Sequence, residues 1–188
     1  KKKDQSYSSK FACPKCGYSI KELEPRLFSF NSPVGACKAC DGLGVNQFFD
    51  ENKIVNKDLS LASGSIKGWD KRNEFYFQII KSLSNHFEFN TEVPFSSLSK
   101  KIQKIILYGT EDEEIKFIYY NNNGKKVTKM QSFEGVISNF ERRYNNTESN
   151  FVREELNKYL SKQVCGECNG TRLCEDARNV FINDKKIT

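Results

Sequence analysis

The sequence predicts an α+β fold, and three observations support this prediction. Stretches with a helical repeat of about 3.6 residues flank one stretch with the two-residue repeat of a strand. Pairs of cysteines with the spacing C-x-x-C occur near both ends of the chain, which is typical of metal-bound loops. The 188 residues include 15 Phe and 8 Tyr, enough aromatic side chains to build a hydrophobic core. We expect a four-cysteine zinc module and a small helix-rich unit with a β-hairpin.

The first segment, residues 1–44, carries the predicted zinc module. Its cysteines, Cys13, Cys16, Cys37 and Cys40, follow the pattern C-x2-C-x20-C-x2-C, the spacing of a structural zinc site. Four thiolates complete a tetrahedron and leave no position for a water molecule, so such a site supports structure and not catalysis. Free or disulfide-linked thiols are the alternative.

The middle segment, residues 45–146, is predicted to form a small α+β unit with its own core. Alternating apolar residues at 115–119, the turn at 121–124 and the stretch 126–130 together predict a β-hairpin. Three apolar faces at helical spacing predict three helices. These faces are formed by Phe75, Ile79, Ile80, Leu83 and Phe87; by Leu98, Ile102, Ile105 and Ile106; and by Phe133, Val136, Ile137 and Phe140.

The last segment, residues 147–188, predicts a helix over 149–161 and a strand over 179–182, with a hairpin turn after it. Between them lie Cys165 and Cys168. Cys174 is a possible third ligand, but a fourth is missing. The pair is either half of a zinc site whose partners lie outside the chain, or two free thiols. Because the second hairpin strand runs into the end of the chain, we expect a piece of a longer protein.

The formal net charge of +6 is compatible with a nucleic-acid partner, but also with an ordinary lysine-rich surface. An aromatic residue among cations can stack on a base or wedge into a duplex, and the cations can contact phosphates. Alternatively, the tryptophan anchors the core, and the two arginines at the end of a helix cap it or form salt bridges. The candidate DNA contacts in this middle segment are Lys67, Trp69, Lys71, Arg72, Lys100, Lys101, Arg142 and Arg143.

Several function classes find no support in the sequence. Neither the phosphate-binding pattern G-x-x-x-x-G-K-[ST] nor the nucleophile pattern G-x-S-x-G occurs, so we predict no catalytic residues. The single histidine, His86, excludes any site that needs two histidines from this chain, and we expect it at a helix end. The acidic run 111–114 is most simply a solvated turn. No stretch approaches the roughly 20 apolar residues that span a bilayer, so no membrane contact is expected.

Residues 11–44 resemble a four-cysteine zinc module of the UvrA family, the damage-recognition ATPases of the bacterial UvrABC excinuclease. Further stretches resemble the same family in the same order, at 67–73, 133–136, 141–144 and 165–173. The resemblance implies a fragment of an ABC-type ATPase of nucleotide excision repair, namely part of signature domain I with the insertion domain. It also implies structural Zn²⁺ on Cys13, Cys16, Cys37 and Cys40, and places Cys165 and Cys168 in another zinc module with ligands far upstream.

The resemblance further implies that this part of the protein is non-catalytic, because the ATP and Mg²⁺ sites lie outside it. The implied partners are damaged duplex DNA, UvrB and a second UvrA subunit, in the cytoplasm. Two alternatives come from other classes. The repeated pattern C-x-x-C-x-G, at 37–42 and 165–170, resembles the zinc repeats of DnaJ-type chaperones and would indicate a protein-interaction module. A purely structural insert, which only positions its neighbours, is the other.

Overall fold

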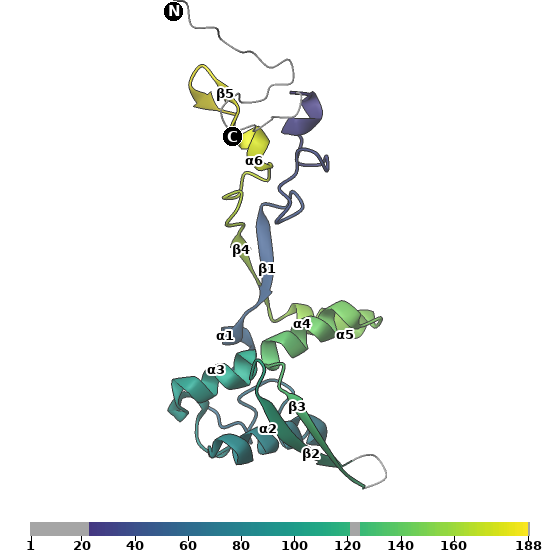
Figure 1. Cartoon of the computed structure of the whole chain (residues 1–188), viewed down its shortest axis with the longest axis vertical. Coiled ribbons are helices and arrows are strands. Elements are labelled where there is room, and N and C mark those ends of the chain that lie inside the picture. The colour runs from purple at the N-terminus through teal and green to yellow at the C-terminus, as the bar shows by residue number, and fades with distance from the viewer. Residues whose placement is uncertain (1–22, 121–124, 188) are drawn as a thin grey trace, which may run out of the picture. The chain divides into compact units, whose positions relative to one another are not determined.

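The computed structural model describes residues 23–120 and 125–187, and these form two compact units (Figure 1). Unit 1 consists of the residues up to Gln47 and from Lys162 onward, and unit 2 is the continuous stretch Phe48–Ser161. The chain leaves unit 1 along β1 (Val45–Phe49) and returns along β4 (Leu160–Val164), and these two strands pair in a two-stranded sheet. Unit 2 is therefore an insertion whose two ends are held together.

Helices are the main regular elements of unit 2, and its two longest apolar stripes form helices as predicted. The side chains of Asn73 and Ser99 accept hydrogen bonds from the backbone N–H of Tyr76 and Ile102, which caps two of these helices at their first turn. The helices are α1 (Glu51–Ile54), α2 (Glu74–Phe87), α3 (Lys100–Tyr108), α4 (Val136–Asn146) and α5 (Asn150–Asn157), with a 3₁₀ turn at Phe95–Ser97.

The predicted hairpin is also present, as the antiparallel strands β2 (Glu114–Tyr120) and β3 (Lys126–Ser132). Helix α2 covers the free edge of β2. The backbone N–H of Ile118 donates to Ser82 Oγ at 3.1 Å, and that of Tyr120 donates to Gln78 Oε1 at 2.9 Å. Because these edge groups are already paired, β2 is closed to pairing with another strand.

A single hydrophobic core holds unit 2 together. It includes an irregular segment, residues 55–73, that no repeat predicts, pinned by the bridges Val55↔Ile66 and Ser60↔Pro94. The largest fully buried side chains of the unit are Trp69, Phe95, Phe140, Ile54, Leu61, Ile66, Ile80, Leu83, Ile106, Ile115 and Val136. Leu156 of α5 belongs to the same core, so the compact unit extends to Ser161 and not only to residue 146, where we expected the insertion domain to end.

Unit 1 has a much smaller core in its described part. Leu27, Leu173 and Ala177 form one buried cluster, and four cysteines form another. Its elements are the 3₁₀ turn η1 (Pro25–Phe28), α6 (Glu175–Arg178) and the short hairpin β5 (Phe181–Ile182) with β6 (Lys185–Lys186). The hairpin expected near residue 183 is thus confirmed. Among the described residues, no helix has both the length and the apolar character needed to cross a membrane.

Candidate metal centre and nucleic-acid interface

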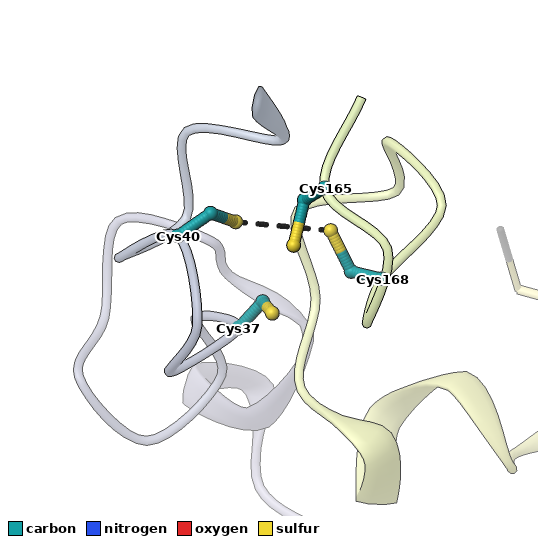
Figure 2. A group of neighbouring side chains, drawn as sticks. All are labelled: Cys37, Cys40, Cys165 and Cys168. Atoms are coloured by element: carbon teal, nitrogen blue, oxygen red, sulfur yellow. Dashed lines mark hydrogen bonds between the residues drawn. The ribbon is translucent and has the colours of Figure 1, made fainter. Parts of the chain in front are cut away.

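Four buried cysteines converge in unit 1 (Figure 2). The sulfur atoms of Cys37, Cys40, Cys165 and Cys168 all lie within 4.8 Å of one another. In Figure 2 the four side chains point toward a common centre, two from each of two chain segments that are far apart in the sequence. Cys40 Sγ and Cys168 Sγ lie 3.7 Å apart.

The two cysteine loops have matching local structure. Each C-x-x-C pair is followed at the same distance by a glycine with positive φ, 74° at Gly42 and 82° at Gly170. At Gly42 a Cβ atom would lie 2.3 Å from the carbonyl oxygen of Phe30, so only glycine fits the turn. The backbone N–H of Cys165 donates to the carbonyl of Gly44 at 3.0 Å, which joins the second loop to the first.

Burial and hydrogen bonding shift the pKa values of two of these thiols in opposite directions. Burial raises the pKa of Cys37 to about 11. For Cys168, burial also opposes ionisation, but hydrogen bonds from the backbone N–H of Arg172 and from the Cys165 thiol outweigh it and lower the pKa to about 7. The loop at Cys168 is therefore built to accept a thiolate.

The geometry fits a tetrahedral metal ion. A Zn–S bond of about 2.3 Å separates neighbouring sulfurs in a tetrahedron by about 3.8 Å, close to the 3.7 Å between Cys40 and Cys168. Four sulfur ligands select zinc or iron over the harder cations. With all four positions filled by protein, the centre would support structure and would not activate water.

This grouping differs from the one that we expected from the spacing. Cys37 and Cys40 lie next to Cys165 and Cys168, so the later pair has candidate partner ligands among the described residues of the chain itself. The reason is the pairing of β1 with β4, which returns the chain to its starting point after the whole insertion. Cys13 and Cys16 lie outside the described residues.

The structure also corrects the expected role of Trp69. Its side chain is 1% exposed, and it stacks on Tyr76 with ring centroids 4.4 Å apart and packs edge-on against Phe133. A residue enclosed in this way is a core anchor and does not reach out to wedge into a duplex. Trp69 is buried because its irregular segment packs against α2, and no local pattern in the sequence predicts this packing.

Two of the cations beside Trp69 are paired with carboxylates. Lys71 Nζ lies 2.9 Å from Glu92 Oε1. Arg72 donates to the buried Asp70 from both Nε and Nη2, and these hydrogen bonds hold the pKa of Asp70 below its usual range. Much of the charge that Arg72 carries therefore serves to neutralise a buried carboxylate.

Of the two arginines of α4, one is paired in the same way. Arg142 donates two hydrogen bonds to Glu134, from Nε to Oε2 at 3.0 Å and from Nη2 to Oε1 at 2.8 Å. Arg143 instead lies over the rings of Tyr76 and Phe140, at 5.7 and 5.9 Å from their centroids. Its charge is not cancelled by a carboxylate, but its side chain is half-buried.

The two lysines at the start of α3 are exposed. Lys100 Nζ donates to the neutral amide of Gln103 at 3.3 Å, and Lys101 has no ion pair in the described part of the chain. Cations in a first helical turn oppose the helix dipole, which costs a few tenths of a kcal/mol to about 1 kcal/mol each. This helix start therefore remains a surface on which an anion would be favoured.

Lys67 lies in a cluster of cations that the sequence analysis missed. A hollow of about 430 Å³ is lined by Lys53, Lys57 and Lys67 together with two asparagines and a valine, and no Asp or Glu is among these lining residues. The bridge Val55↔Ile66 brings the three lysines together, and the backbone N–H of Lys67 donates to the carbonyl of Ile54 at 3.2 Å.

None of these three lysines is neutralised by a carboxylate at salt-bridge distance in the described residues. Lys53 Nζ donates to the carbonyl of Leu160 at 2.5 Å, and Lys57 Nζ donates to Asn52 Oδ1 at 3.1 Å. The only signal in the sequence is the four-residue spacing between Lys53, which lies in α1, and Lys57, which follows that helix. Three lysines therefore line one hollow with no acidic residue among its lining residues.

Comparison with known proteins decides the family. The UvrA DNA-binding domain family matches residues 50–158, which is more than half of the chain. The chain belongs to the UvrA DNA-binding domain family. The matched residues lie within unit 2, so unit 2 is the UvrA DNA-binding domain. The resemblance stated from the sequence is confirmed.

Individual relatives agree with this assignment. The chain is 56% identical over 185 residues to the UvrABC system protein A of Vibrio cholerae, covering 98% of this chain and 20% of that protein. Its identity to the UvrABC system protein A of Escherichia coli K12 is 52% over 182 residues, covering 96% and 19%. The chain thus spans about a fifth of the length of these UvrA relatives.

A solved structure shows the same fold. The crystal structure of UvrA2 from Deinococcus radiodurans superposes with a TM-score of 0.68 at 22% identity, covering 93% of this chain and 22% of that chain. The superposition covers both the inserted UvrA DNA-binding domain and most of the surrounding segments, so the architecture of an insertion with joined ends is shared.

Proposed function

We propose that this chain is a DNA-contacting part of a UvrA protein, and that the basic hollow formed by Lys53, Lys57 and Lys67 binds the phosphate backbone of duplex DNA. The single observation that carries this proposal is the convergence of three cations around a hollow whose lining residues include no Asp or Glu, on a domain of the UvrA DNA-binding family. In the longer protein, this contact would serve damage recognition in nucleotide excision repair.

The physical basis of the contact is counterion release. Each phosphate that a lysine neutralises frees a condensed counterion from the duplex, so binding weakens steeply as salt rises. Unpaired lysines supply this term in full, whereas Lys71 and Arg142 would first have to give up their carboxylate partners. The exposed lysines at the start of α3 are a second candidate phosphate contact.

Structural zinc is the second part of the proposal. Cys37, Cys40, Cys165 and Cys168 would hold one Zn²⁺, whose role is to fix the two C-x-x-C loops to each other. The binding of the metal would thereby become folding free energy of unit 1. We assign no catalytic step to the described residues, and we place ATP and Mg²⁺ binding, UvrB and the second UvrA subunit in other parts of the full-length protein.

Charge removal tests the DNA contact. We would replace Lys53, Lys57 and Lys67 together by glutamine and measure duplex binding by fluorescence anisotropy at several salt concentrations. If each lysine contacts one phosphate, the slope of log K against log salt should become shallower by about 2–3. Affinity at low salt should fall with it.

A matched control variant carries the same change in net charge elsewhere on unit 2. Lys71, Lys81 and Lys158 would be replaced by glutamine; the first and last of these are ion-paired, and Lys81 lies over the ring of Phe77. The control should keep the salt slope of the wild type. Equal slopes in both variants would show that the hollow has no special role, and no binding by the wild type at low salt would move DNA contact out of this chain.

A further inference from the structure

Unit 2 contains a second cavity, of about 330 Å³, with walls that are mainly aromatic. It lies among residues of α2, the end of β3 and α4, together with the buried Trp69. Its lining residues include Trp69, Phe75, Tyr76, Phe133, Asn139 and Arg142.

Two buried polar atoms on the residues that line this cavity have no hydrogen-bond partner among the described residues. One is the indole N–H of Trp69, and the other is the side-chain oxygen of Asn139. Their residues are 1% and 3% exposed. Leaving a buried donor or acceptor unpaired costs about 1–3 kcal/mol, so one orphan of each kind at the same cavity points to a missing partner.

The orientation of the Asn139 amide is fixed by its neighbour. Its Nδ2 donates to Glu134 Oε1 at 2.8 Å, and an ionised carboxylate can only accept. Glu134 remains ionised because the hydrogen bonds from Arg142 hold its pKa below the usual range. The free group of Asn139 is therefore a carbonyl acceptor, while Trp69 offers a donor.

Aromatic rings form a continuous path from the floor of the cavity to its mouth. Trp69 stacks on Tyr76, and Phe75 packs edge-on against Tyr76 with centroids 5.3 Å apart. Phe75 is 52% exposed, although a phenylalanine is normally buried. Because Trp69 and Tyr76 are in direct stacking contact, a flat ligand would stack on the exposed ring of Phe75, and these side chains would have to move for it to reach the two orphan groups.

We propose that this cavity binds a single nucleobase that is unstacked from DNA, an inference that rests on the DNA contact proposed above. A nucleobase is a planar ring that stacks on aromatic side chains, and its hydrogen-bonding edge carries a donor and an acceptor side by side. The acceptor would receive the N–H of Trp69, and the donor would bond the carbonyl of Asn139. Arg142, which also lines the cavity, stays paired with Glu134 and so keeps the carboxylate that orients the Asn139 amide ionised.

The cavity itself provides the reporter for a test, because Trp69 is the only tryptophan in the chain. We would titrate the 188-residue chain with a duplex that has one extrahelical thymine, and with the same duplex in which that nucleotide is abasic. Both probes present the same phosphates. The thymine duplex should quench Trp69 fluorescence and bind about 5- to 100-fold more tightly than the abasic duplex.

Two variants locate the effect. Asn139→Leu removes the buried acceptor, and Phe75→Ala removes the exposed ring at the mouth without touching the core. Both should abolish the preference for the thymine duplex. The matched control is Phe151→Ala, since Phe151 on α5 is 72% exposed and does not line the cavity. Because Phe75 is on the surface, its variant keeps the test valid even if Asn139→Leu does not fold.

The outcomes separate this inference from the proposed function. Equal binding of both duplexes with unchanged Trp69 fluorescence would overturn the nucleobase site and leave the phosphate contact standing, with the cavity filled by water only. A preference that survives Phe75→Ala but not Phe151→Ala would also overturn it. No salt-dependent binding of either duplex would refute the DNA contact itself.

Discussion

Replacing Cys165 and Cys168 by serine should unfold unit 1 and leave unit 2 intact. The two buried leucines of the described unit 1 core, Leu27 and Leu173, contribute on the order of 3–6 kcal/mol. A structural zinc ion on cysteine ligands contributes roughly 10–16 kcal/mol at neutral pH, which is more than this core supplies. Unit 2 has its own separate core around Trp69 and does not depend on the metal.

The assay combines metal analysis with a fold readout for each unit. The wild type should hold one zinc per chain, and the C165S/C168S variant should hold none. Limited proteolysis should then cut unit 1, while the fluorescence of the buried Trp69 stays as in the wild type. The comparison variant is C13S/C16S, which should keep its zinc. If C13S/C16S loses the metal and C165S/C168S keeps it, the ligand set that we infer from the geometry is refuted.

Three further predictions concern the stability of unit 2. Asp70→Asn should lower the melting temperature at pH 7 and have little effect near pH 2. Hydrogen bonds from Arg72 lower the pKa of Asp70 in the folded state. The ionised Asp70 therefore stabilises the fold above its unfolded pKa of about 3.9, and this stabilisation is lost as pH falls through the lower, folded pKa. Gln103→Leu should cost about 2–4 kcal/mol in urea denaturation, since the Gln103 amide donates to three backbone carbonyls, of Phe95, Ser96 and Leu98. Gly109→Ala should cost about 1–3 kcal/mol by the same assay, because φ is +96° and the added Cβ would lie 2.3 Å from a backbone oxygen. An Asp70→Asn effect that is equal at both pH values would contradict this role of Asp70. An unchanged free energy of unfolding for Gln103→Leu or Gly109→Ala would contradict the role assigned to that residue.

Local patterns in the sequence predicted the regular elements of unit 2. Helices α2 and α3 follow from apolar residues at helical spacing, and the hairpin follows from strict alternation at Ile115, Phe117 and Tyr119. In each case the signal lies within a few residues of the element that it predicts. The burial of Trp69 was not predictable in this way, because its segment has no repeat and is fixed only by distant bridges.

The grouping of the cysteines depends on contacts across the whole insertion. Cys40 and Cys168 are 128 residues apart, and only the pairing of β1 with β4 brings them together. Spacing alone favours the nearest C-x-x-C pair in the sequence, which contains Cys13 and Cys16. One signal was present: the loops at 37–42 and 165–170 share the pattern C-x-x-C-x-G, which is what two loops facing the same metal would show.

The basic hollow was hidden for a similar reason. Lys53 and Lys57 are visible as a spaced pair, but nothing near them in the sequence indicates that Lys67 joins them. Conversely, Lys71 and Arg72 stand beside Lys67 in the sequence and yet are occupied by carboxylates. A count of charges along the sequence does not show which cations are paired with carboxylates. The structure shows this pairing for Lys71 and Arg72.

The most direct test of the DNA contact is lysine footprinting of the wild-type chain. An acetylating reagent would be applied with and without duplex DNA, and the modification of each lysine would be read by mass spectrometry. Our account predicts that DNA protects Lys53, Lys57 and Lys67, while Lys81 and Lys158 react equally in both samples. Uniform protection of all five, or protection confined to Lys81 and Lys158, would contradict the placement of the DNA backbone at the hollow.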